Sequence, residues 1–261
     1  MTEPIVENNK FIYTLSGKVL PERAVVNLPQ QVLMVASNEG TMPLGWQLTI
    51  SIINSQIAAR LSSTQEVTDV EDMRERVEGA IRFCVDSLGY ILACGYDVEL
   101  TQVTLIQPEP MQHIVFGVDV QGIRPKQQYT HQEVLDLFQK TVAVPRHKQQ
   151  PLRRALVDFR EAIRSYEDTP FFCFRAIEDI RQLFVTDQDN DVKRTWEKMS
   201  ASLNVPIESI EYVWKKLRPI ATQLRHGGSV DATSRADRLE MLKITWSIID
   251  LFILASIPAS D

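Results

Sequence analysis

The first 120 residues alternate between apolar and polar positions in the way that half-buried strands do. Within residues 45–62, apolar side chains occupy every second position from Trp46 to Ile52, and polar residues stand between them. A period of two places one face of a strand against a core and the other face in water. Residues 11–28 are predicted to form a strand as well, with Pro21 in a turn or at an edge.

A change of period near residue 70 predicts one long helix. The apolar residues now recur three or four positions apart, as one stripe of a helix does: Val70, Met73, Val77, Ile81, Cys84, Leu88 and Ile91. Thr68 or Asp69 is expected to cap its start, and Gly95 to take the left-handed conformation at its end. Alternation returns over residues 98–120, where the segment 108–110 separates two strands as a hairpin turn would. The pattern predicts an antiparallel sheet crossed by one long helix, an α+β layer.

From Thr130 onward the apolar spacing is helical. Thr130 with Glu133, and Ser234 with Asp237, have the spacing of capping boxes. Apolar stripes predict four or five amphipathic helices with short connections, the pattern of a helical bundle. These stripes lie over residues 152–163, 171–184, 196–203, 207–217 and 239–253. Pro219 is expected to kink or restart the fourth helix, because its ring clashes with the preceding turn.

The segment 140–151 is basic and contains two prolines, so it is the predicted boundary between domains. The chain is thereby divided into an α+β sheet domain at residues 1–128, a helix and basic linker at 129–150, and an all-α bundle at 151–261. The fold class expected is α+β, with an N-terminal antiparallel sheet followed by a helical bundle.

The charge of the chain differs between its parts. The formal net charge is -6, but residues 1–120 hold 7 Lys/Arg against 15 Asp/Glu, whereas residues 121–150 hold 5 against 2. This balance excludes a uniformly basic nucleic-acid binder and leaves room for a local basic patch. Arg146, Lys148, Arg153 and Arg154 form such a group and are the candidate RNA-binding residues. The acidic N-terminal domain is expected to recognise a protein partner.

Several classes of chemistry have no motif in the sequence. It contains no GxGxxG, GxxxxGK, HExxH or GxSxG, so neither a cofactor nor a nucleophilic serine is predicted. Asp187, Asp189 and Asp191 imitate the start of a calcium loop, but Val192 stands where glycine is needed and Lys198 where glutamate is needed, so no metal site is predicted. Three cysteines without a CxxC pair fit a reducing cytoplasm. The longest apolar run, residues 246–257, is too short to span a membrane.

Residues 217–252, LRPIATQLRHGGSVDATSRADRLEMLKITWSIIDLF, place Arg218, Arg225 and His226 at the end of one helix, before a Gly-Gly loop and a long apolar helix. This segment, with the aromatic and charged stretch at residues 162–184, resembles the C-terminal part of a HEPN domain. HEPN domains are small helical bundles named for nucleotide binding in prokaryotes and eukaryotes. The resemblance covers about residues 150–257 and implies pairing of two bundles into a homodimer.

The resemblance also implies a candidate catalytic group. Active HEPN ribonucleases have an Arg four to six residues before a His: the His moves a proton of the ribose hydroxyl, and the Arg stabilises the charge on phosphorus. Here His226 occupies the position of the family's histidine, but Pro219, Ile220 and Ala221 occupy the expected Arg positions. Arg218 lies about 80° from His226 in helical face. Three interpretations stay open: a helix-capping pair, a site that binds RNA or a nucleotide without cleaving it, and a ribonuclease.

Two functions follow from these observations. The first is a cytoplasmic two-domain binding and assembly protein, whose bundle forms a homodimer and binds RNA or a nucleotide, without a cofactor, metal or membrane. The second is a metal-independent HEPN ribonuclease of a toxin–antitoxin or anti-phage system, with His226, Arg218 and Arg225 as its catalytic residues. Arg175 and Glu178, one turn apart, could face the groove of the bundle, but an ion pair within their helix is the more common outcome for such a spacing.

Overall fold

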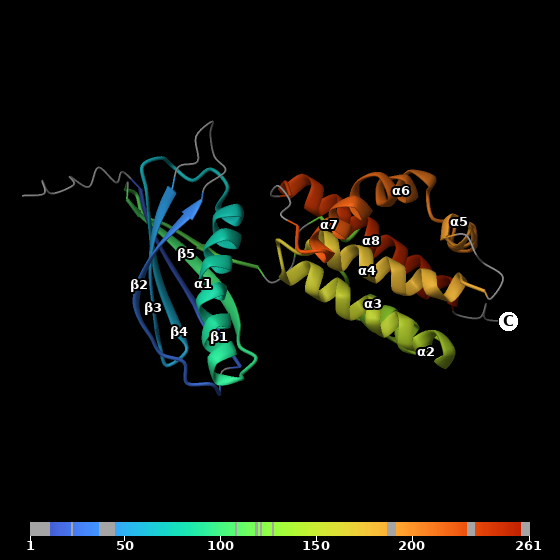
Figure 1. Cartoon of the computed structure of the whole chain (residues 1–261), viewed down its shortest axis with the longest axis horizontal. Helices are drawn as coiled ribbons and strands as arrows, with labels where there is room; N and C mark the ends of the chain where they lie inside the picture. Colours follow the sequence, from blue (N-terminus) through green and yellow to red (C-terminus); the bar gives the residue numbers. More distant parts are fainter. Residues whose placement is uncertain are drawn as a thin grey trace, which may run out of the picture. The chain divides into compact units, whose positions relative to one another are not determined.

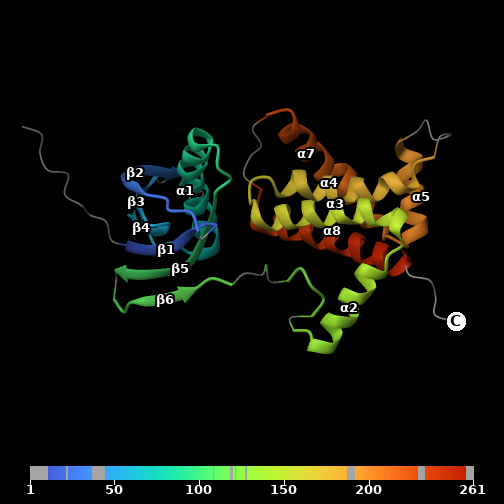
Figure 2. The same ribbon diagram turned by 90° about the horizontal axis from the view of Figure 1, so that it is seen from below.

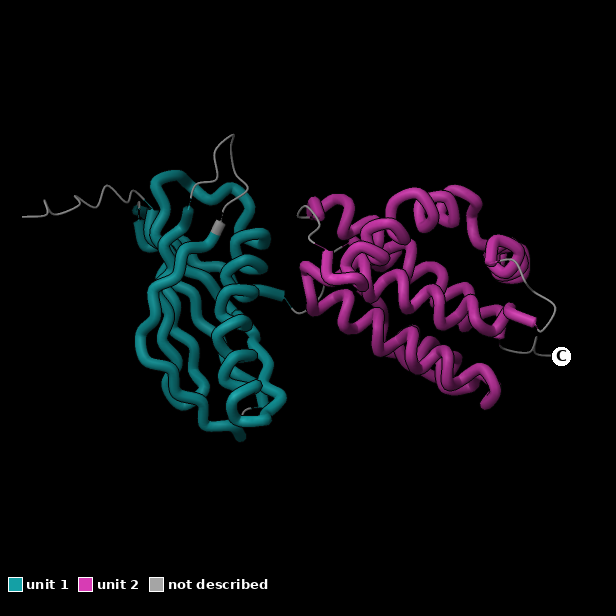
Figure 3. The backbone as a smooth tube through the Cα atoms, in the orientation of Figure 1, with its two compact units in different colours: residues 1–118 teal, residues 119–261 magenta. Residues whose placement is uncertain are grey.

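The computed structural model describes residues 11–21, 23–36, 45–107, 109–117, 120, 122–126, 128–186, 192–228 and 233–256. The chain divides into two compact units, residues 1–118 and residues 119–261 (Figure 3). The first unit holds the antiparallel sheet and one long helix, and the second is helical, so the expected α+β fold class is confirmed. Residues 119–128, assigned to the sheet domain from the sequence, belong to the helical unit.

The sheet of the first unit has, in the described residues, six antiparallel strands in the order β2-β3-β4-β1-β5-β6 (Figure 1). The strands are β1 (Phe11–Leu20), β2 (Leu28–Ala36), β3 (Gly45–Ile53), β4 (Gln56–Ser63), β5 (Asp97–Gln107) and β6 (Gln112–Val115). The outermost strands of this order, β2 and β6, are therefore the two edges of the sheet.

The prediction of one strand over residues 45–62 was wrong, because a tight turn divides it into the hairpin of β3 and β4. Asn54 and Ser55 form this turn with φ of 50° and 63°, the left-handed values that two-residue hairpin loops require. The buried Ser55 hydroxyl donates to the Ala24 carbonyl and accepts the Val26 N–H. The strand β2 was also missed, since the segment predicted as a strand ended at its first residue, Leu28.

Helix α1 (Val70–Leu92) lies against one face of this sheet (Figures 1 and 2). Its predicted stripe is confirmed at Met73, Val77 and Ile81, which are fully buried, but it is wrong at Ile91, which is 71% exposed. Asp69 is the cap, and its carboxylate accepts the N–H groups of the first turn. The left-handed residue at the end of the helix is Ala93, with φ of 52°, rather than Gly95. The helix thus ends at Leu92, and the Cys94 N–H bonds back to the Gly89 carbonyl.

Gly17 is required by a close approach of β1 to β5. The pairing of these strands shifts register between Ser16 and Gly17. A Cβ atom at Gly17 would lie 2.1 Å from the carbonyl oxygen of Glu99, a distance that no side chain can occupy. The absence of a side chain therefore lets the two central backbones meet at this point.

The second unit consists of helices joined by short connections (Figure 1). They are α2 (His131–Ala143), α3 (Arg146–Arg164), α4 (Thr169–Arg181), the 3-10 turn η1 (Gln182–Phe184), α5 (Val192–Leu203), α6 (Ile207–Tyr212), the π turn η2 (Val213–Leu217), α7 (Arg218–Arg225) and α8 (Arg235–Ser256). The Thr130–Glu133 capping box is confirmed, and the Ser234 hydroxyl accepts the Asp237 N–H before α8.

The basic segment predicted as a linker is largely helical. Only Val144 and Pro145 separate α2 from α3, which begins at Arg146. Pro145 immediately precedes the first turn, where a missing N–H leaves no helical bond unmade. Lysine and arginine are good helix formers, so their density here reflects an exposed helix face rather than an irregular segment.

The core of the helical unit lies around α4, α8 and the helices packed on them. Ile177 of α4, Trp196 of α5 and Phe252 of α8 are almost fully buried. The stripe predicted over residues 152–163 is rotated, because Leu156 is exposed while Asp158 faces the interior. The disturbance predicted at Pro219 takes the form of the π turn η2, which widens the helix one turn before the proline ring.

Candidate functional site

The predicted catalytic residues lie along α7, and their backbone ends the helix. Arg218 is its first residue, Arg225 its last, and His226 follows as the cap. The His226 N–H donates to the carbonyls of Thr222 and Gln223, and Gly227 takes a left-handed φ of 72°. The capping geometry expected from the Arg-His-Gly sequence is therefore present.

The side chains of these three residues are not gathered into one cluster. The Arg218 guanidinium lies over the Trp214 ring, 4.2 Å from its centroid. Arg218 and Arg225 are about two helical turns apart, roughly 10 Å along the axis. His226 is exposed, and among the described residues no hydrogen bond joins its ring to either arginine. The ring is accessible to a ligand, and the described residues supply no hydrogen-bond partner for it.

The four predicted RNA-binding residues lie on different sides of α3. Arg146 and Arg153 are seven residues apart and share the exposed face of the helix. Lys148 lies elsewhere, with Nζ 3.5 Å from the Ser256 hydroxyl of α8. Arg154 lies near the carboxylate of Asp179 on α4, whose charge it stabilises. Only two of the four therefore point together into solvent.

Two further arginines, which were not among the predicted RNA-binding residues, extend this exposed side of α3. Arg160 and Arg164 lie on the same exposed side of the helix as Arg146 and Arg153. We call these four residues the arginine face. It is about 27 Å long, from the helical rise over 18 residues. Arg160 shares its charge with Glu161 through a 2.6 Å contact of Nη2 with Oε1.

A group of charges holds α3 against α4. The Arg175 Nε lies 3.2 Å from Oδ2 of Asp158, which is only 4% exposed. Burial raises the pKa of Asp158 and of Asp179, and Arg175 opposes that rise at both carboxyls. The expected pair of Arg175 with Glu178 is not formed, because Glu178 instead lies 3.4 Å from Arg181. These contacts between packed helices indicate a structural role.

A buried arginine of α8 fastens the end of α3. Arg238 donates from Nε to the Thr169 hydroxyl at 2.9 Å and from Nη2 to the Ile163 carbonyl at 2.7 Å. Its guanidinium also lies over the Tyr166 ring. A cation at the carboxyl end of a helix satisfies unbonded carbonyls and opposes the negative end of the dipole. The burial of Arg238 was not predicted, because an arginine in a helical pattern is normally expected to be exposed to solvent.

Helix α2 exposes its apolar side. None of its residues is buried, and Figure 2 shows it reaching out from the other helices of its unit. We call its exposed large apolar residues the α2 apolar face: Val134, Leu135, Leu137, Phe138 and Val142. Phe138 is 62% exposed. A contiguous apolar stripe of this kind usually marks a binding surface.

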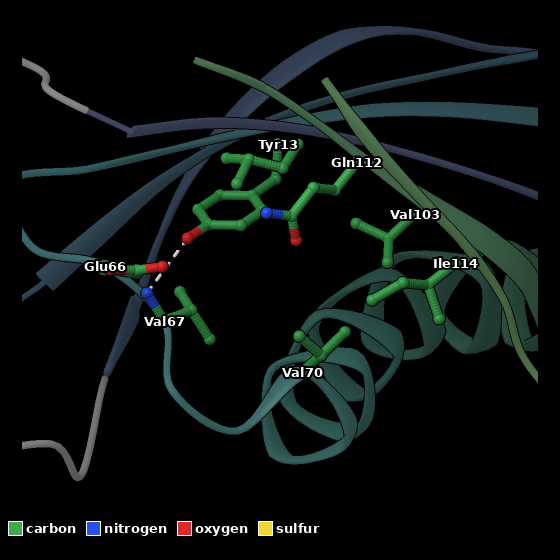
Figure 4. A pocket seen from close by; sticks show the side chains of 8 residues that line it. Tyr13, Glu66, Val67, Val70, Val103, Gln112 and Ile114 are labelled. Atoms are coloured by element: carbon green, nitrogen blue, oxygen red, sulfur yellow. Dashed lines mark hydrogen bonds between the residues drawn. The ribbon is translucent and has the colours of Figure 1, made fainter. Parts of the chain in front are cut away.

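The first unit contains a small cavity beneath β5 and β6, at the start of α1 (Figure 4). It measures about 50 Å³ and is lined by Val70, Val103, Leu105 and Ile114, with Glu66 and Gln112 as polar neighbours. The Tyr13 hydroxyl accepts the Val67 N–H at 2.9 Å and fixes one wall. Polar and apolar atoms contribute almost equally to the surface of the cavity.

Some classes of site are missing from the part of the chain that the structure describes. No group of three or more His, Cys, Asp or Glu residues there could hold a metal ion. The calcium-loop imitation at Asp187, Asp189 and Asp191 lies outside the described residues. Within the described ranges, no helix is both long and apolar enough to cross a bilayer.

Two family models match the chain, one in each half. Residues 13–116 match the model described as "Domain of unknown function (DUF8168) N-terminal domain", and residues 137–256 match its "C-terminal domain". No curated protein and no solved structure matches the chain significantly. Neither model is that of a HEPN family, so the HEPN resemblance stays a prediction.

Proposed function

Because the descriptions of the two matching DUF8168 domain models name no activity, we propose a function from the chain's own surfaces: a binding protein that pairs with a second copy through α2. The observation that carries this proposal is the α2 apolar face. This helix has a capping box but no buried residue, so packing within its own unit stabilises it little. Burial of its apolar residues against a partner would stabilise it much more.

A second copy suits this face because the sequence of α2 is self-complementary. When two α2 helices run antiparallel about a two-fold axis at Phe138, Val134 of one copy lies opposite Val142 of the other. The same axis brings the two Phe138 rings together at the centre. Closed two-fold contacts of one patch with itself are the commonest way in which soluble proteins assemble.

Sedimentation of the wild-type chain and of a Phe138→Ala variant tests this proposal. The wild type is expected to sediment as a dimer, with twice the 29.8 kDa mass of one chain, and the variant as a monomer. A wild type that stays monomeric at tens of micromolar would contradict the proposal.

The arginine face of α3 favours RNA as the ligand of this assembly. Four arginines on one exposed side can each contact a phosphate, and a row of about 27 Å spans several nucleotides. Leu156 and Val157, both partly exposed beside the row, offer apolar surface to the bases. Guanidinium groups are well suited to phosphate oxygens because their donors form a planar fork.

Binding of a fluorescent single-stranded RNA at several salt concentrations tests the arginine face. Four phosphate contacts predict a slope of about -3 in log affinity against log salt, and the double variant Arg146→Glu/Arg153→Glu should reduce it to about -1.5. A matched charge reversal on α5, Lys193→Glu/Arg194→Glu, should leave the slope nearly unchanged. Equal loss in both double variants would mean that overall charge, and not this face, attracts the RNA.

The same experiment addresses the ribonuclease alternative. The exposed His226 ring favours it, since an accessible imidazole can exchange a proton with a ribose hydroxyl. RNA that is shortened by the wild type and left intact by a His226→Ala variant would assign cleavage to this residue. RNA that is retained at its full length would favour binding alone.

A further inference from the structure

The strand β6 leaves its outer edge open to another strand. Within the described residues it pairs only with β5, with Ile114 opposite Val103 and Val115 opposite Gln102. The Phe116 N–H donates to the Thr101 carbonyl at 2.9 Å, which identifies that pair as hydrogen-bonded. Because bonded and non-bonded pairs alternate in an antiparallel ladder, Ile114 bonds to β5, while the backbone groups of His113 and Val115 point outward.

The cavity of the first unit lies directly behind this edge (Figure 4). Gln112 and Ile114 of β6 form one of its walls, and Val70 of α1 forms the opposite side. At roughly 10–15 Å³ for each water-sized space, its 50 Å³ could take about three to five heavy atoms. This is the size of a valine or leucine side chain.

One acidic side chain lies at the cavity. Glu66 is exposed there, whereas Glu71 and Asp72 in the first turn of α1 are paired with Arg74 and Arg76. The excess of acids extends over the whole segment, with 15 Asp/Glu against 7 Lys/Arg in residues 1–120. An incoming chain is therefore attracted when it is basic and repelled when it is acidic.

We propose that the first unit binds an extended basic peptide of a partner protein as a strand beside β6, with one aliphatic side chain in the cavity. The outward N–H and C=O groups of His113 and Val115 would bond to the peptide backbone. The cavity would select a side chain on one face of the added strand, and Glu66 would select a basic neighbour of that side chain. Strand addition combines backbone bonds for affinity with side-chain pockets for specificity. This inference is independent of assembly through α2 and of RNA binding.

Two fluorescent probe peptides of alternating sequence test the proposal on the full chain: Lys-Val repeated over seven residues, and its Glu-Val counterpart. The Lys-Val peptide is expected to bind saturably, and the Glu-Val peptide at least about tenfold more weakly. Hydrogen exchange with the Lys-Val peptide should slow at residues 112–115. Failure of the Lys-Val peptide to bind, or protection confined to β2, would overturn the proposal.

Variants at the edge and in the cavity separate this site from general attraction by acids. Val115→Pro removes an outward N–H while leaving the bonds to β5, and edge strands tolerate proline, so binding should weaken about tenfold with the fold retained. Ile114→Phe fills the cavity and should also weaken binding. Met34→Lys, on the opposite edge strand β2, is the matched control and should leave the affinity unchanged. Undiminished binding to Val115→Pro, with circular dichroism unchanged, would overturn the proposal.

Discussion

Replacement of Phe138 by alanine is the sharpest test of assembly through α2. The change removes the largest side chain of the α2 apolar face and leaves the helix intact, because alanine is the better helix former. The capping box at Thr130 and Glu133 is not touched. Any change in assembly would therefore come from the lost apolar surface.

The size of the effect follows from the exposure of the ring. A phenylalanine side chain has about 150–250 Å² of surface, and 62% of Phe138 is exposed, so a dimer could bury roughly 120 Å² on each copy. At about 25 cal/mol per Å², this gives about 3 kcal/mol per copy and about 6 kcal/mol per dimer. Alanine keeps part of that contact, so we expect a loss of about 4 kcal/mol, or about a thousandfold in the dissociation constant.

Sedimentation velocity over a range of concentrations measures this constant directly. Phe83→Ala provides the matched control, because Phe83 is 75% exposed but lies on α1 of the first unit. We expect the Phe83 variant to remain dimeric under conditions in which the Phe138 variant is monomeric. Dissociation of the Phe83 variant together with persistence of the Phe138 dimer would refute the reasoning.

Two further predictions concern stability and are measured by urea unfolding. Gly17→Ala places a Cβ against the Glu99 carbonyl and should destabilise the first unit by about 1–3 kcal/mol. Gly79→Ala on α1 has open space around it and should stabilise the unit by up to about 1 kcal/mol. Equal changes in the free energy of unfolding for the two variants would contradict this prediction. Asp158 has a pKa raised by burial, so its stabilising contribution is complete below the unfolded value of 3.8 and is lost as pH rises through the folded pKa. The stability of the wild type minus that of Asp158→Asn should therefore fall with rising pH, and a constant difference would count against the burial of an ionising carboxyl.

The helices with regular apolar spacing could be predicted because burial and periodicity agree in them. The stripe of α1 from Met73 to Ile81 needs no information beyond its own sequence, and the same holds for the capping box before α2 and for the Ser234 cap of α8. The β3–β4 hairpin was missed because Asn54-Ser55 lacks the glycine that usually announces such a turn. Its left-handed residues are supported by bonds of Ser55 to residues about thirty positions away, which no local pattern contains.

The candidate surfaces could be predicted less well, because they depend on which side of each helix meets the core. Arg146 and Arg153 were predicted to bind RNA, and their alignment with Arg160 appears only once α3 is known to start at Arg146. For Asp158 and Arg238, the sequence pattern did not predict burial. Charged residues in amphipathic patterns are assigned to solvent, and their burial follows from contacts among three different helices.

The two hydrophobic cores of the chain share no residue: one runs from Phe11 to Phe116 in sequence, and the other begins at Ile123. Each core is therefore expected to melt as its own cooperative transition, and one melting temperature does not describe the whole protein. A damaging substitution in the sheet would leave the helical half native, and the reverse would hold as well. Natural selection can then tune the stability of the two halves separately.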